Sequence, residues 1–185
     1  KGGNEGQMRE LARYINKNQT LGPVFTLNLN GGEMTMEDTP LVEDKLDSIR
    51  KLYSEHGKPM KFDVVGYSRG AEYAHYIALK KGSWEIRNGF CYYKQGAIDS
   101  WREEFGKMIR IGSVILETEK TALDPSMLSA IYEVTGEDDI LMPQRSLLEK
   151  EHQFHIKSGH VGLMQSDQCF KWVVKVLSSS VAASN

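Results

Sequence analysis

Cysteine, long apolar runs and strong net charge are all scarce in this sequence, and each scarcity argues against a class of protein. The chain of 185 residues has two cysteines, with no CxxC pair and no Cys/His ligand spacing, so no zinc site or other metal site is predicted. It has no run of 18 apolar residues, so no transmembrane helix is predicted. The net charge of −2 predicts no nucleic-acid partner and no attraction to an anionic membrane. Walker and dinucleotide-binding motifs are absent, so no cofactor is predicted.

The two cysteines, Cys91 and Cys169, lie far apart in the sequence and among apolar neighbours. This setting favours two buried free thiols, with a disulfide or a reactive thiol as the alternatives. The sequence shows no signal peptide and opens with Lys1, so it predicts no particular cellular compartment.

The composition is that of an ordinary globular protein, with 40% hydrophobic and 26% charged residues. The length favours one domain, predicted over 1–177, and the segment 178–185 is predicted to be a flexible tail. Hydrophobic periodicity and turn signals predict helices over 7–17, after Thr39-Pro40, over 71–80, 143–150 and 170–177, and strands over 24–29, 62–65, 88–93, 128–134 and 153–156. The alternation predicts an α/β fold with a mostly parallel sheet of about five strands and helices on both faces.

The region 97–127 does not follow this alternation clearly. The spacing of Trp101, Phe105, Met108 and Ile109 suggests a helix, and a short apolar segment follows over 111–116.

A G-x-S-x-G pattern, Gly66-Tyr67-Ser68-Arg69-Gly70, lies between the strand at 62–65 and the helix at 71–80. A serine on a sharp turn in this context presents its hydroxyl away from the backbone, as a nucleophile requires. Glycines on either side let strand and helix approach closely. The backbone N–H of Arg69, at the start of the helix, can then stabilise an oxyanion.

A histidine and an acid follow later strands. His160 lies in Ser158-Gly159-His160-Val161-Gly162-Leu163, directly after the last strand, and is favoured over His56, His75, His152 and His155 by that position. The acidic turn Gly136-Glu137-Asp138-Asp139 follows the strand at 128–134 and could orient that histidine.

These three motifs, in the chain order Ser, Asp, His, resemble the α/β-hydrolases, and most closely their lipase and esterase branch. The family pattern of glycine, two variable residues, aspartate and a later proline matches Gly136, Asp139 and Pro143. The resemblance therefore implies Ser68 as nucleophile, His160 as base and Asp139 as the orienting acid, with Asp138 as the near alternative and Asp99 as a more distant one.

The resemblance implies a serine hydrolase that cleaves a small-molecule or lipid carboxylic ester through an acyl-enzyme. An acyltransferase on the same fold and a non-catalytic interaction module are the alternatives. In such enzymes the region 97–127 often holds a lid, and apolar residues there could line an acyl pocket; ordinary core packing is the other interpretation.

One departure concerns the second oxyanion donor, which the family places after its third strand. Only one helix fits between Gly32 and Phe62, so 24–29 corresponds best to the fourth strand. The first three strands would then lie upstream of Lys1, and the chain would be about the C-terminal two-thirds of a catalytic domain. The second donor would come from another segment or from the backbone at 30–32, or the isolated chain would be poorly active.

Overall fold

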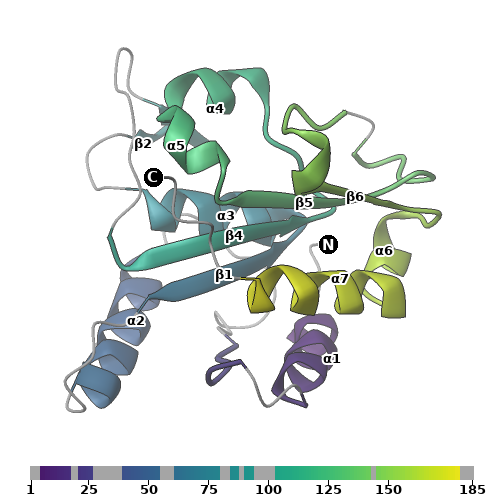
Figure 1. The fold of residues 1–185 in the computed structure, drawn as a ribbon. Coiled ribbons are helices and arrows are strands. Elements are labelled where there is room, and N and C mark those ends of the chain that lie inside the picture. The colour runs from purple at the N-terminus through teal and green to yellow at the C-terminus, as the bar shows by residue number, and fades with distance from the viewer. Residues whose placement is uncertain are drawn as a thin grey trace.

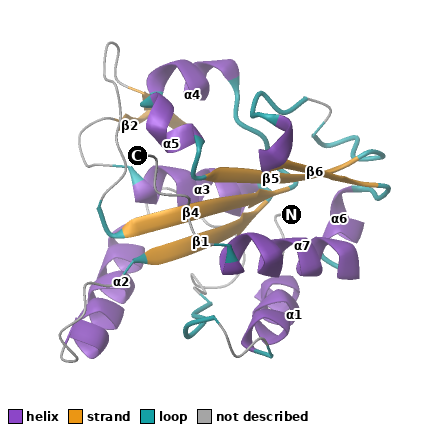
Figure 2. Cartoon of the chain, viewed as in Figure 1, coloured by secondary structure: helices purple, strands orange, loops and turns teal. Residues whose placement is uncertain are grey.

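The protein is described by a computed structural model that covers residues 5–17, 21–26, 39–54, 61–79, 84–87, 90–93, 103–142 and 145–179. Its centre is a four-stranded parallel sheet (Figures 1 and 2). The strand order is β1 (Phe62–Tyr67), β4 (Phe105–Ile111), β5 (Ile131–Gly136) and β6 (Gln153–Ile156). The helices are α1 (Glu5–Asn16), α2 (Thr39–Ser54), α3 (Arg69–Ala78), α4 (Glu117–Ala122), α5 (Pro125–Leu128), α6 (His160–Leu163) and α7 (Asp167–Ser178). The predicted α/β class with a parallel sheet is therefore confirmed.

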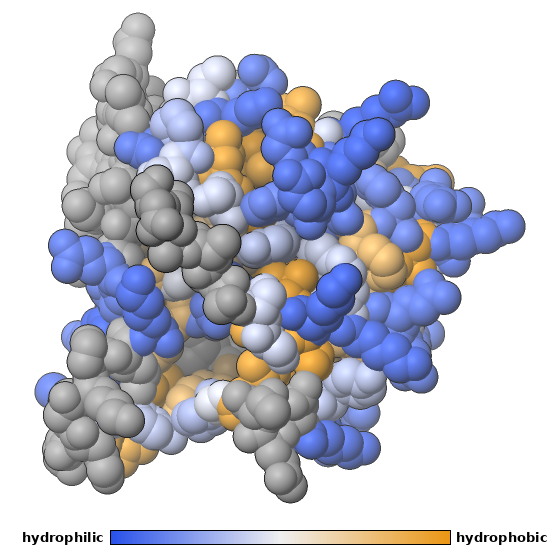
Figure 3. Space-filling view, in the orientation of Figure 1, coloured by the Kyte–Doolittle hydropathy of each residue, from blue (hydrophilic) through white to orange (hydrophobic). Residues whose placement is uncertain are grey.

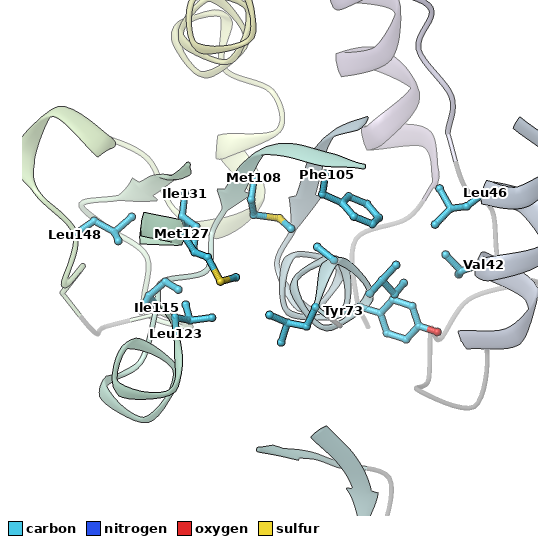
Figure 4. Close-up of a cluster of buried hydrophobic side chains, with 13 residues drawn as sticks. Val42, Leu46, Tyr73, Phe105, Met108, Ile115, Leu123, Met127, Ile131 and Leu148 are labelled. Carbon is cyan, nitrogen blue, oxygen red and sulfur yellow. The ribbon is translucent and has the colours of Figure 1, made fainter. Parts of the chain in front are cut away.

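Helices cover both faces of the sheet, as predicted, because successive residues of each strand face opposite sides. Met108 of β4 belongs to a core cluster with side chains of α2, α3 and the α4–α5 segment (Figure 4). Its neighbour Ile109 belongs to a second cluster with side chains of α1, α6 and α7. In Figure 1, α1 and α7 lie on the opposite side of the sheet from α4 and α5.

The helix predicted over 101–109 is wrong for its described part, because Phe105–Ile111 forms a central strand. Phe62 pairs with Phe105 and Val64 with Met108, so three steps along β4 match two along β1. This bulge turns Phe105 and Met108 to the same face three residues apart, a spacing that imitates a helix. The lid interpretation is therefore wrong for 105–111, which is core.

Two further expectations on strands change. The predicted strand at 88–93 appears as β3 (Phe90–Tyr93), but it pairs antiparallel with β2 (Trp84–Arg87) outside the parallel sheet. For the strand predicted at 24–29, residues 24–26 are irregular and 27–29 lie outside the described residues. The sequence predicts about five parallel strands, and the parallel sheet has four within the described ranges.

The helix predicted at 143–150 is wrong over 145–149, which is irregular and precedes a short 3-10 helix at Lys150–His152. Cys169 is a buried free thiol, as the sequence favours, and burial raises its pKa to about 12. The side chain of Cys91 lies outside the described part of the chain. Most of the predicted tail, 180–185, lies outside it as well. Among the described helices, none combines the length and the apolar character that crossing a bilayer requires.

Candidate active site

Ser68 occupies a strained turn between β1 and α3. Its φ of 53° and ψ of −129° make it the one non-glycine residue with positive φ in the described part of the chain. Such a conformation costs roughly 1–3 kcal/mol and persists only where the surroundings enforce it. The N–H of Ser68 donates to the carbonyl oxygen of Ile111 at 2.7 Å, which ties the turn to the end of β4.

Gly66 is required by this turn, whereas Gly70 is not. A Cβ at position 66 would overlap with the Cα of Ala71 and lie 2.7 Å from its nitrogen, so only glycine lets α3 start this close to β1. A Cβ at position 70 would meet no described atom within 4 Å. The expectation that both glycines permit the close approach therefore holds for one of them.

Three side chains that the sequence singles out form a continuous hydrogen-bonded chain. The Nε2 atom of His160 lies 2.8 Å from Ser68 Oγ, and its Nδ1 atom lies 2.6 Å from Asp139 Oδ2. The three residues follow β1, β5 and β6, so they meet at the carboxyl edge of the sheet, where parallel α/β sheets carry their functional groups. Their chemical roles stay predictions; their proximity is observed.

Asp139 is held rigidly beside the imidazole. Its side chain is 1% exposed, and its Oδ1 atom accepts the N–H groups of Leu141 (3.0 Å) and Met142 (3.1 Å). This leaves Oδ2 for His160, so both carboxylate oxygens have fixed partners. A carboxylate in this position orients the ring and stabilises the imidazolium form.

The acidic turn reaches the histidine segment because of Gly136. A Cβ at this position would overlap with the carbonyl oxygen of Ser158, which precedes His160 by two residues. That same oxygen accepts the N–H of Asp138 at 3.2 Å. Asp138 itself is exposed, and the geometry favours Asp139 over it. Asp99, the distant alternative, lies outside the described residues.

The other described histidines have different surroundings. His75 is fully buried in α3, and burial, with a smaller effect of Arg110, lowers its pKa to about 4. The Nδ1 atom of His152 lies 2.8 Å from the carbonyl oxygen of Ile131, and that of His155 lies 2.6 Å from Thr135 Oγ1. His56 lies outside the described residues. None of these contacts involves Ser68.

Arg69 is the first residue of α3, and the first N–H groups of a helix have no acceptor within it. The backbone N–H of Arg69, next to Ser68 in the chain, therefore has no acceptor within the helix, and its role as an oxyanion donor stays a prediction. The alternative donor segment, 30–32, lies outside the described residues.

Two residues that contact His160 are not predicted by the sequence reasoning. Tyr67 packs its ring against the imidazole, and Gly112 lies close to it. Tyr67 stands next to Ser68 in the motif, a signal that could have drawn attention to it. Gly112 has no local signal, since its contact depends on β4 and α6 meeting in the fold.

Three exposed apolar side chains directly follow members of the site in the sequence, and together they are called the apolar rim. Ile140 and Leu141, directly after Asp139, are 88% and 66% exposed, and Val161, directly after His160, is 56% exposed. A separate open groove of about 450 Å³ lies between α1 and the start of α7 and shares no residue with the Ser68 site. The groove is therefore not the pocket of this site.

Comparisons with known proteins add no relative. No model of a protein family matches the chain, and the search of curated proteins finds no match either.

Proposed function

We propose that this protein is a serine hydrolase of the α/β-hydrolase type that cleaves carboxylic esters. The hydrogen-bonded chain from Ser68 through His160 to Asp139, starting on a strained turn at the carboxyl edge of a parallel sheet, carries this proposal. The three residues come from loops after three different strands, so a chance arrangement of this kind around an ordinary surface serine is improbable.

The proposed reaction proceeds through an acyl-enzyme. His160 Nε2 takes the proton of Ser68 as Oγ attacks the ester carbonyl carbon, and the Arg69 N–H donates to the resulting oxyanion. His160 then gives the proton to the departing alcohol oxygen as the C–O bond breaks. Water, deprotonated by His160, attacks the acyl carbon. His160 then returns the proton to Ser68 Oγ as the bond between Oγ and the acyl carbon breaks, which releases the acid and free Ser68. Asp139 stabilises the imidazolium in both steps.

The apolar rim supports an ester with an apolar acyl or alcohol group, such as a lipid ester. Ile140, Leu141 and Val161 are exposed immediately beside two members of the site. The surface viewed in Figure 3 is a mixture of polar and apolar areas. Three exposed aliphatic side chains at one site can each contribute roughly 1–2 kcal/mol when an apolar substrate covers them.

A fluorophosphonate probe tests the proposal, because it labels a serine only when a neighbouring base activates it. We expect the wild-type protein to be labelled at Ser68 and to hydrolyse nitrophenyl esters. Ser68→Ala should lose both properties, whereas Ser48→Ala, on the exposed face of α2, should keep both. An unlabelled wild-type protein, or a label that persists in Ser68→Ala, would refute the assignment.

A further inference from the structure

The imidazole of His160 is held by more than its two hydrogen bonds. Asp139 and Ser68 fix the two ring nitrogens, but two such bonds leave the ring free to tilt about the line between them. Such a tilt leaves Nε2 close to its place but turns its lone pair away from the Ser68 hydroxyl. Residues that pack against the ring would therefore control how well proton transfer is aligned.

Tyr67 makes one such contact from the end of β1. Its ring centre lies 5.2 Å from that of the imidazole, with 32° between the planes. Its hydroxyl donates to the backbone carbonyl oxygen of His160 at 3.1 Å, so it also holds the start of α6. Burial, and secondly the charge of Asp139, raise the pKa of Tyr67, so the hydroxyl keeps its proton and acts as a donor.

Gly112 makes the second contact from the end of β4. Its φ of +60° is unfavourable for any residue with a Cβ, and its N–H donates to the carbonyl oxygen of Val134 at 2.8 Å. A Cβ here would lie 2.9 Å from Cε1 and 3.1 Å from Nδ1 of His160. A methyl group at this position would therefore push the imidazole out of its alignment with Ser68 and Asp139.

We propose that Tyr67 and Gly112 are positioning residues that fix the tilt of the His160 imidazole towards Ser68. The inference rests on the proposed hydrolase function and extends it to two residues that act through their contacts with His160. Tyr67 acts through its ring and its hydroxyl, and Gly112 acts by having no side chain.

The first test compares steady-state kinetics of Tyr67→Phe, Tyr67→Leu and Gly112→Ala on a nitrophenyl ester. Tyr67→Phe keeps the ring and loses one neutral hydrogen bond, so we expect kcat to fall about fivefold. Tyr67→Leu loses the ring as well and should fall further. Gly112→Ala displaces the imidazole and should lower kcat about 100-fold. KM should change less than about threefold in all three.

The matched control is Tyr132→Phe, which removes a hydroxyl from a tyrosine on strand β5 of the same sheet. Tyr132 stacks on His152, with ring centres 4.6 Å apart, and has no part in the Ser68 site. We expect its kcat to stay within about twofold of the wild type. An equal loss in Tyr132→Phe and Tyr67→Phe would assign the effect to general packing and overturn the proposal.

A second readout reports the position of His160 without activity. The proton between His160 Nδ1 and Asp139 Oδ2 should give a far-downfield proton NMR signal in the folded protein. Gly112→Ala should shift or broaden that signal, and Tyr67→Phe should shift it less. An unmoved signal in both variants overturns the positioning role, even if the wild-type protein proves unreactive towards the fluorophosphonate. Tyr67→Phe decides the matter if Gly112→Ala fails to fold, because it adds no atom.

Discussion

Replacing Asp139 by asparagine tests the site most sharply, because the structure dictates how the amide must orient. Oδ1 of Asp139 accepts two backbone N–H groups, and Oδ2 accepts from His160. In Asp139→Asn, the amide oxygen can take the two N–H groups, which leaves the NH₂ group facing His160 Nδ1. The opposite orientation would set the NH₂ group against two backbone donors. It would lose two hydrogen bonds, each costing about 1–3 kcal/mol when left unmade.

The favoured orientation forces the wrong tautomer on His160. With an NH₂ donor at Nδ1, that nitrogen must be the acceptor, so the ring proton moves to Nε2. Nε2 then cannot accept the proton of Ser68, although it stays near Oγ. In serine-protease triads the equivalent change lowers kcat about 10⁴-fold, which corresponds to about 5 kcal/mol of transition-state stabilisation. We expect a loss of this order in kcat/KM.

The assay is the hydrolysis of a nitrophenyl ester at pH 8, with thermal unfolding measured in parallel. Asp138→Asn is the matched control, since it makes the same chemical change one residue away on an exposed side chain. We expect the control to keep kcat/KM within about twofold. If Asp139→Asn retains more than a tenth of the wild-type value, or if the control loses as much, the assignment of Asp139 is wrong.

The remaining predictions concern substrate choice and stability. Leu141→Asp should lower kcat/KM for a long-chain ester several-fold more than for an acetate ester, because the exposed rim side chain then repels apolar chains; equal losses would contradict the rim's role. Gly66→Ala should destabilise the fold by at least about 2 kcal/mol in urea unfolding, since its Cβ meets backbone; unchanged stability would contradict the packing of the turn. Lys107→Met should destabilise the end of α7 by about 1–3 kcal/mol, because the buried ammonium donates to the carbonyl oxygens of Val176 (2.6 Å) and Leu177 (3.3 Å). We expect faster amide hydrogen exchange near 176–178, and unchanged exchange would argue against this role of Lys107. The pKa of His75 in the folded protein is about 4, below the ordinary 6.5, so the unfolded state binds the proton first as the pH falls. The stability of the fold should therefore be highest above pH 6.5 and fall by about 3 kcal/mol as the pH drops towards 4. His75→Leu should lack this loss, and parallel curves of stability against pH for the two proteins would refute the prediction.

Signals that are local in sequence identified the candidate site residues. The strand–turn–helix setting of Ser68, the glycine three residues before Asp139 and the position of His160 after the last strand each depend on a few neighbouring residues. Parallel strands place their carboxyl ends at one edge, so the order of the motifs was enough to predict that the three side chains meet. The geometry that favours Asp139 over Asp138 needed the coordinates, since both acids lie on the same turn.

Tertiary structure decided the features that depend on partners distant in the sequence. The bulge opposite Phe62 makes Phe105 and Met108 share a face, and no local rule separates that spacing from a helix. The pairing of β3 with β2, outside the parallel sheet, likewise depends on which strand lies beside it in the fold. Gly112 reads as an ordinary loop glycine until β4 and α6 bring its backbone against His160. Sequence patterns alone thus predicted which three residues meet at the edge of the sheet, while packing between separate elements decided how the histidine is held.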